Sequence, residues 1–270
     1  MKLVCVTGAN KGIGRGIVET LIKEHQHLTV LMTARNSELG LATKGELMEA
    51  YPHTDKLHFH QLDITDPTSV SGFLEYVRSS FGHLDVLVNN AGIATKGTTF
   101  NKEVASNTLG TNFYATIDFT EKALPLVSEG GSIVFVGSRT GLGRKIPGAD
   151  LKVKLLNPDI TRDEAFELAS DFINRVGDGT WTEAGWPSNT YSVSKILLNC
   201  YTRALAHQLT VSGRRVRVNV LCPGWVKTDM AGPNAQLTIF EGAAMPVQLV
   251  NYEGEETGKF WYDGQMQSFE

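Results

Sequence analysis

Short apolar runs alternate with helical patterns along most of the chain. Runs rich in Val, Leu and Ile predict strands at residues 2–7, 28–34, 56–63, 84–90, 131–138, 215–222 and 258–264. Apolar residues spaced three or four apart predict helices at residues 14–25, 37–51, 67–81, 109–124 and 191–209. Apolar strands that alternate with helices are typical of a parallel sheet covered on both faces. We therefore expect an α/β fold, a three-layer doubly wound parallel sheet of the Rossmann type.

The alternation is interrupted once, between residues 138 and 191. Within this segment Thr161 and Glu164 form a capping box, and apolar residues then continue at helical spacing to Val176. The apolar face of such a helix must cover another part of the protein. No repeat or linker divides the rest, so we expect a single domain over residues 1–270 with an insertion at about 142–185.

The composition is that of a soluble globular protein. Of 270 residues, 41% are hydrophobic and 20% charged, and the formal net charge of −4 comes without a basic cluster that could hold nucleic acid. No apolar run reaches the roughly 18 residues that span a bilayer. The three cysteines form no Cys-x-x-Cys pair, which favours reduced thiols. We expect a cytoplasmic protein with no nucleic-acid or membrane partner.

Histidine and cysteine residues give little sign of a metal site. His58 and His60 would share one face of a strand, but no further ligand is spaced to join them. Cys222 precedes Pro223 and is either a reactive thiol or a buried small residue. We expect no bound metal.

A glycine-rich loop, "VTGANKGIG", joins the first strand to the first helix. Its glycines, Gly8, Gly12 and Gly14, allow a tight turn and a close approach of backbone to a pyrophosphate. The N-terminus of the following helix offers N–H groups and a positive dipole end. The alternative is a glycine-rich turn without a ligand, but its place between strand and helix favours phosphate binding.

Charge near this loop indicates which dinucleotide would bind. A site for NAD usually offers an acidic side chain at the end of the second strand. Here that strand ends in Ala34 and Arg35, and Lys11 lies within the glycine-rich loop. Two cations favour the 2′-phosphate of NADP(H), unless both are merely solvated surface charges.

Seven motifs follow one another in the order of a known family. They are "TGANKGIG", "LDI" at Asp63, "NNAG", "TNFYAT" around Asn112, Ser138, "YSVSK" and "CPGWVKT". With them the chain resembles the short-chain dehydrogenase/reductase family over nearly its whole length. "RNSELG", "CPGWVKTDMAGP" and the long segment between Ser138 and Tyr191 resemble its branch of monomeric NADPH-dependent carbonyl reductases.

The resemblance implies roles for individual residues. The implied catalytic set is Asn112, Ser138, Tyr191 and Lys195, and the implied substrate contacts are Ser138, Tyr191 and Trp225. Together with the phosphate loop, the expected cofactor contacts are Gly8, Asn10, Lys11, Gly12, Ile13, Gly14, Arg35, Asp63, Ile64, Asn90, Ala91, Gly92, Tyr191, Lys195, Pro223, Val226 and Thr228. The chain departs from many relatives at Gly137, where they carry a second serine.

The implied reaction is hydride transfer from NADPH to a small ketone, aldehyde or quinone, with Tyr191 as the proton donor. The charge of Lys195 is expected to lower the pKa of Tyr191. Asn112 would hold a water beside Lys195. The alternative is that its side chain makes only a buried structural hydrogen bond. Alternatives are an NADP-dependent alcohol or steroid dehydrogenase that acts oxidatively, and a non-catalytic protein that senses NADP(H).

The helix at residues 191–209 is apolar on more than one face and must be covered. In many members of the family this helix packs against a second subunit. We expect the insertion helix to cover it instead, which would make the protein a monomer. The alternative is that the insertion is a lid over the substrate.

Overall fold

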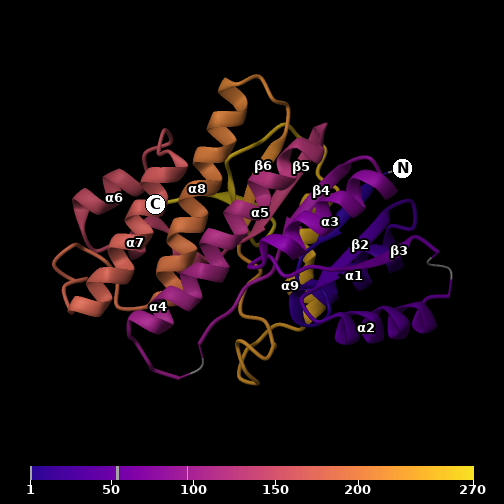
Figure 1. Ribbon diagram of the computed structural model, residues 1–270, viewed down its shortest axis with the longest axis horizontal. Helices are drawn as coiled ribbons and strands as arrows, with labels where there is room; N and C mark the ends of the chain where they lie inside the picture. Colours follow the sequence, from indigo (N-terminus) through magenta and orange to yellow (C-terminus); the bar gives the residue numbers. More distant parts are fainter. Residues whose placement is uncertain (1, 53–54, 96) are drawn as a thin grey trace.

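Eight strands form one sheet in the part of the chain that the computed structural model describes, which is residues 2–52, 55–95 and 97–270 (Figure 1). In spatial order they are β3 (Leu57–Gln61), β2 (Thr29–Ala34), β1 (Leu3–Val6), β4 (Leu84–Asn89), β5 (Val127–Val136), β6 (Arg217–Leu221), β7 (Phe260–Tyr262) and β8 (Gln265–Gln267). All neighbours pair in parallel except β7 and β8, which are antiparallel. The expected doubly wound order is confirmed.

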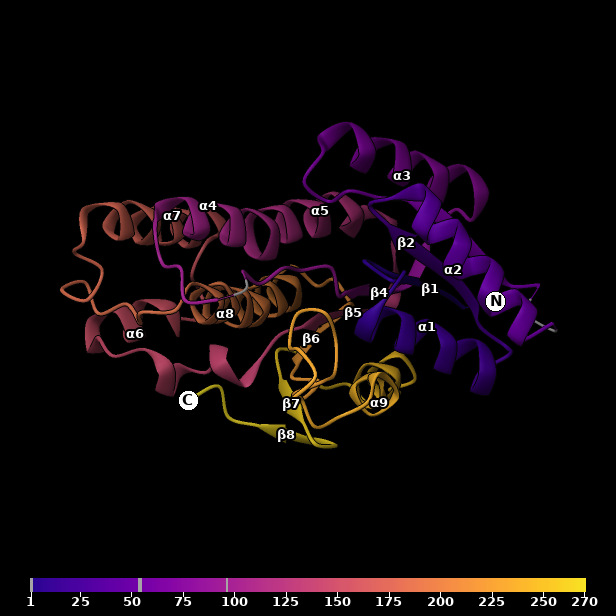
Figure 2. The same cartoon turned by 90° about the horizontal axis from the view of Figure 1, so that it is seen from below.

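Helices cover both faces of the sheet, which gives the three layers (Figure 2). One face carries α1 (Gly12–Glu24), α2 (Ser37–Ala50) and α9 (Ile239–Val250); the other carries α3 (Pro67–Ser80), α4 (Lys102–Leu109), α5 (Thr116–Ala123) and α8 (Thr190–Val211). Strand β1 shows why both layers form. Its Leu3 and Cys5 belong to the core under α3 and α8, whereas Val4 and Val6 belong to the core under α1 and α9.

The segment between β5 and α8 folds into α6 (Ala149–Leu155) and α7 (Arg162–Asp178) beside α4 and α8 (Figure 1). Thr161 caps α7, and the predicted capping box with Glu164 is present. The buried stripe of α7 consists of Ala165, Ala169, Phe172 and Val176. The predicted amphipathic helix is therefore confirmed, and its apolar face lies against α4 and α8.

Several elements differ from the sequence prediction. Helix α6 was not expected, and β5 begins at Val127 rather than at residue 131. The helix expected from residue 109 begins at Lys102, and it contains a π-helical stretch, Gly110–Ala115, between α4 and α5. Helix α9 and strand β8 were not expected. Helix α9 contains Pro246, which normally interrupts a helix, and all three residues of β8 are exposed.

Candidate active site

Helix α8 places Tyr191 and Lys195 one turn apart at the carboxyl edge of the sheet. Its N-cap Asn189 accepts a 2.7 Å hydrogen bond from the backbone N–H of Ser192, which fixes where the helix begins. Lys195 is buried, and its Nζ lies 5.7 Å from the centre of the Tyr191 ring. The same Nζ donates a 2.8 Å hydrogen bond to the carbonyl oxygen of Val136 at the end of β5.

Ser138 lies two residues beyond the end of β5, in extended backbone before a short 3₁₀ turn. Its hydroxyl oxygen accepts hydrogen bonds from the backbone N–H of Thr140 at 3.2 Å and from the Thr140 hydroxyl at 3.0 Å. The Tyr191 phenol lies close enough to this hydroxyl for Ser138 to lower the pKa of the tyrosine. The structure thus brings Ser138 together with Tyr191 and Lys195, although the serine lies far from both in sequence.

Asn112 lies in the π-helical stretch, and its side chain ties three segments together. Its Oδ1 accepts from the backbone N–H of Ile93 at 2.7 Å, and its Nδ2 donates to the Ile93 carbonyl at 2.8 Å and to the Ser194 hydroxyl at 3.1 Å. Ser194 in turn donates to the carbonyl of Tyr191 at 2.8 Å. The side chain of Asn112 therefore makes buried structural hydrogen bonds, as the alternative to a water-binding role predicts. A water beside Lys195 stays a prediction.

Burial controls the ionisation of the Tyr191–Lys195 pair. It raises the pKa of Tyr191 to about 12, helped by the nearby Cys222 and opposed by the hydrogen bond with Ser138. Burial also lowers the pKa of Lys195 to about 8. The expectation that Lys195 lowers the pKa of Tyr191 is therefore wrong, because desolvation of the phenol dominates and Lys195 is not among the groups that shift it.

The glycine-rich loop has the shape that a phosphate needs. Gly8 and Gly12 have φ angles of +63° and +56°, a backbone conformation that residues with a side chain rarely adopt. A Cβ on Gly14 would lie 2.4 Å from the carbonyl oxygen of Gly8. Lys11, the N-cap residue of α1, makes no capping hydrogen bond within the described structure. The N–H groups that open α1, from Gly12 to Gly14, are thus left for an anion.

Hydrogen bonds of Thr7 and Asn90 connect the glycine-rich loop to the segment that follows β4. The Thr7 hydroxyl oxygen accepts from the backbone N–H groups of Asn90 and Ala91, each at 3.0 Å. Asn90 Nδ2 donates to the carbonyls of Thr7 and Gly8 at 2.9 and 3.1 Å. The Asn90 side chain therefore positions the loop. Thr7 was not among the predicted site residues, although it stands at the end of the first strand.

The loop after β6 reaches over the glycine-rich loop. The methyl Cγ2 of Thr228 lies 3.2 Å from where a Cβ on Gly12 would be. Lys11 Nζ forms a 2.7 Å ion pair with Asp229, and both side chains are largely exposed. Arg35 is exposed just beyond β2, the neighbour of β1. The two expected cations thus lie at one edge, but Asp229 is a carboxylate that the charge argument overlooked.

The remaining predicted residues fall around the same edge. Asp63 follows β3, and its carboxylate accepts hydrogen bonds from the N–H and hydroxyl of Thr65 at 2.9 and 2.6 Å. Val226 is buried, whereas Trp225 is 52% exposed and available to a ligand. The other positions at this edge are Asn10, Ile13, Ile64, Gly92 and Pro223.

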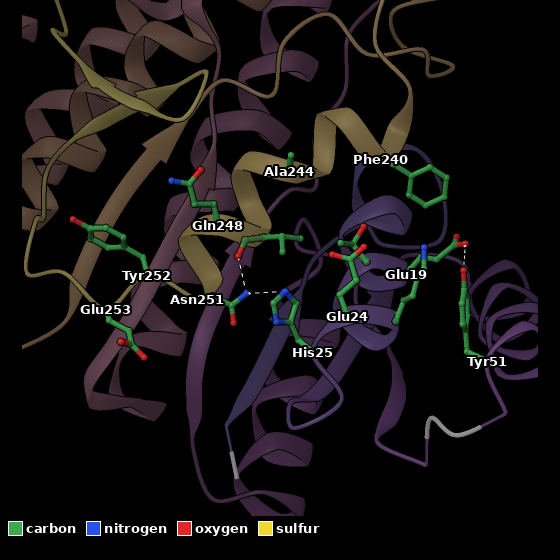
Figure 3. A pocket seen from close by; sticks show the side chains of 13 residues that line it. Glu19, Glu24, His25, Tyr51, Phe240, Ala244, Gln248, Asn251, Tyr252 and Glu253 are labelled. Carbon is green, nitrogen blue, oxygen red and sulfur yellow. Dashed lines mark hydrogen bonds between the residues drawn. The ribbon is translucent and has the colours of Figure 1, made fainter.

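A separate groove of about 760 Å³ lies between α1 and α9 (Figure 3). Tyr51 donates a 2.9 Å hydrogen bond to Glu19, and the amide nitrogen of Asn251 lies 3.4 Å from Nε2 of His25. The lining follows α9 from Phe240 to Asn251 and includes neither Tyr191 nor any residue of the glycine-rich loop. It takes no part in the site above.

Among the described residues, no group of three or more His, Cys, Asp or Glu side chains is arranged to hold a metal ion. None of the described helices has both the length and the apolar character needed to cross a membrane.

Two family models match the chain. The short chain dehydrogenase model matches residues 2–149, and the enoyl-(acyl carrier protein) reductase model matches residues 180–250. The residues between the two matches include helix α7 and all but the first residue of α6.

Individual proteins agree with this assignment. Carbonyl reductase [NADPH] 1 of Mus musculus is 39% identical over 250 residues, which cover 90% of this chain and 88% of that protein. Short-chain dehydrogenase/reductase 1 of Saponaria officinalis is 35% identical and covers 98% of this chain and 95% of its own. The structure of salutaridine reductase from Papaver somniferum superposes with a TM-score of 0.87 at 29% identity, covering 97% of this chain and 100% of that one. The chain belongs to the short-chain dehydrogenase family.

Proposed function

We propose that this protein is an NADPH-dependent reductase of carbonyl groups in small ketones, aldehydes or quinones. The observation that carries the proposal is the meeting of Ser138, Tyr191 and Lys195 at the sheet edge that also holds the glycine-rich loop. The carbonyl reductase of Mus musculus, named for its use of NADPH, supports the same activity.

The cofactor site fits a dinucleotide phosphate. The pyrophosphate would lie against the loop glycines and the N–H groups at the start of α1. Lys11 and Arg35 would face a 2′-phosphate. The loop after β6, which contacts Gly12 through Thr228, would close over the nicotinamide end. When bound, NADPH supplies the hydride.

The protein's own residues supply orientation and a proton. The hydroxyls of Ser138 and Tyr191 would hold the substrate oxygen, where negative charge develops during reduction. A pKa of about 12 keeps the phenol of Tyr191 protonated at neutral pH, so it is ready to donate to that oxygen. Lys195, when charged, would favour the phenolate that remains. Trp225, half exposed beside this edge, would contact the rest of the substrate.

The test is the variant Tyr191→Phe, assayed by loss of NADPH absorbance with a panel of quinones, aldehydes and ketones. Turnover should fall by about 10²- to 10⁴-fold because the proton donor is gone. NADPH binding, followed by fluorescence, should remain. Tyr51→Phe, in the groove between α1 and α9, is the matched control and should keep full activity. NADPH binding without any turnover in the unaltered protein would favour the sensing alternative.

We also infer that residues 142–185 are an insertion and that the protein is a monomer in the cytoplasm. Helix α7 buries its apolar stripe on α4 and α8. Arg162 pairs with Asp118 and Glu121 of α5, which ties the start of α7 to the same layer. The three cysteines are buried and unpaired, as expected in a reducing compartment.

A further inference from the structure

Asn199 follows Lys195 by one helical turn and faces the loop that carries Ser138. It is fully buried, and its Nδ2 donates a 3.0 Å hydrogen bond to the carbonyl oxygen of Ser138. The same carbonyl accepts the N–H of Gly141 at 3.0 Å, closing the 3₁₀ turn. Two donors from different segments therefore meet on the backbone of Ser138.

This arrangement is unfavourable for stability taken alone. Asn199 Oδ1 is buried and has no hydrogen-bond partner among the described residues. A buried acceptor without a partner destabilises a protein, and an apolar side chain of similar size would avoid that cost. The asparagine thus has a use other than packing.

Two glycines make room for the Asn199 amide. A Cβ on Gly137 would lie 2.3 Å from Asn199 Oδ1, and a Cβ on Gly141 would lie 2.7 Å from its Nδ2. Neither glycine has a positive φ, so space rather than backbone conformation requires them. A Cβ on Gly141 would lie closer still, at 2.4 Å, to the backbone carbonyl of Lys195. The Asn199 amide therefore limits the space at Gly137, and it shares that role with the backbone of α8 at Gly141.

We propose that Asn199 is a positioning residue, which holds the backbone of Ser138 so that the serine hydroxyl meets Tyr191. With the hydrogen bond from Lys195 to Val136, it forms a second anchor between α8 and the end of β5. Both anchors start from the face of α8 that carries Tyr191. This inference rests on the proposed reductase activity.

The test is a double-mutant cycle with Asn199→Leu and Ser138→Ala. Asn199→Leu should lower kcat about ten- to a hundredfold, because small displacements of catalytic groups have effects of that size. In the Ser138→Ala background the same substitution should change kcat little. Thr202→Val is the control. Thr202 is equally buried on α8, but among the described residues its hydroxyl donates only to the Leu198 carbonyl of its own helix.

A second variant keeps the test independent of folding defects. Asn199→Asp keeps the shape, but only the protonated acid can donate to the Ser138 carbonyl. Its activity relative to the unaltered protein should therefore rise as the pH falls. The inference is overturned if Asn199→Leu and Ser138→Ala act additively, or if neither Asn199 variant changes kcat. Absence of turnover in the unaltered protein would overturn the proposed function instead.

Discussion

The ammonium of Lys195 donates its hydrogen bond to the carbonyl oxygen of Val136, 2.8 Å away, and not to Tyr191. The lysine of the Tyr-x-x-x-Lys pair is thus anchored to the sheet, and its position depends on where β5 ends. Lys195 is buried, and burial disfavours its charged form and lowers its pKa to about 8. A buried cation of this kind should reduce the stability of the fold.

Replacement of Lys195 by Met should raise the free energy of unfolding at pH 7. A pKa of 10.5 in the unfolded chain against about 8 in the folded one corresponds to about 3 kcal/mol of destabilisation. The lost hydrogen bond to Val136 offsets about 1 kcal/mol of the gain.

The pH dependence of this effect has a defined sign. Between pH 8 and 10.5 the unfolded state binds more protons at Lys195 than the folded state, so the unaltered protein gains stability as the pH rises. The advantage of Lys195→Met should shrink over that window. Urea unfolding at several pH values measures it, with the exposed Lys154→Met as control. An advantage that is constant with pH would contradict the buried-cation interpretation.

The ion pair between Lys11 and Asp229 should compete with the cofactor. We expect Asp229→Asn to free Lys11 for the 2′-phosphate and to tighten NADPH binding by up to about fivefold, because exposed pairs contribute roughly 0.2–1 kcal/mol. The effect should weaken in high salt. Titration by fluorescence measures it, with NADH as the comparison ligand.

Glu46→Gln provides the matched control for that substitution. It breaks the 2.8 Å ion pair between Glu46 and Arg15, which is similar in length. Arg15 lies on α1, the helix that begins directly after Lys11. It should leave NADPH affinity unchanged. Equal effects of Asp229→Asn on NADPH and NADH would show that Lys11 does not meet a 2′-phosphate.

Sequence patterns predicted the parts of the fold whose burial is regular. Strand β1 is apolar on both faces because helices cover both, and that leaves a continuous apolar run. Strand β8 has no such signal, since it is exposed and joins the sheet only by pairing with β7. Helix α9 is hidden by Pro246, although its capping box, Thr238 and Glu241, marks its start.

The site was predictable where one residue carries a motif, and not where a contact joins distant segments. Ser138, Tyr191 and Lys195 were found because each belongs to a family pattern. Thr7, Ser194 and Asp229 act through hydrogen bonds or ion pairs with residues 82 or more positions away, which no local spacing reveals. The direction of the pKa shift of Tyr191 was predicted wrongly, because it depends on burial, which sequence spacing does not give.

Gly137 should be coupled to Asn199. Gly137→Ala should destabilise the protein by about 1–3 kcal/mol, because the new methyl meets Asn199 Oδ1 at 2.3 Å. In an Asn199→Ala background the same change should be milder, since the closest contact is gone and those with Val220 and the Leu221 carbonyl remain. Thermal unfolding of the two single variants and the double variant measures the coupling. Strict additivity would mean that Asn199 does not set the space at Gly137.

The cover that α7 provides should decide the oligomeric state. Light scattering of the unaltered protein should give the mass of one chain at every dilution, because α7 already occupies the apolar surface of α4 and α8. Ala169 is fully buried on α7. Ala169→Arg should displace the helix, since a charged side chain cannot be buried there without a partner. The uncovered surface should then associate, which would appear as a larger, concentration-dependent mass.

Glu167→Arg is the control for that variant. It introduces the same side chain two residues away, where α7 faces solvent, and should stay monomeric. A dimer mass for the unaltered protein across the dilution series would contradict the covering role. If the insertion were only a lid over the substrate, Ala169→Arg would change KM and leave the mass of the protein unchanged.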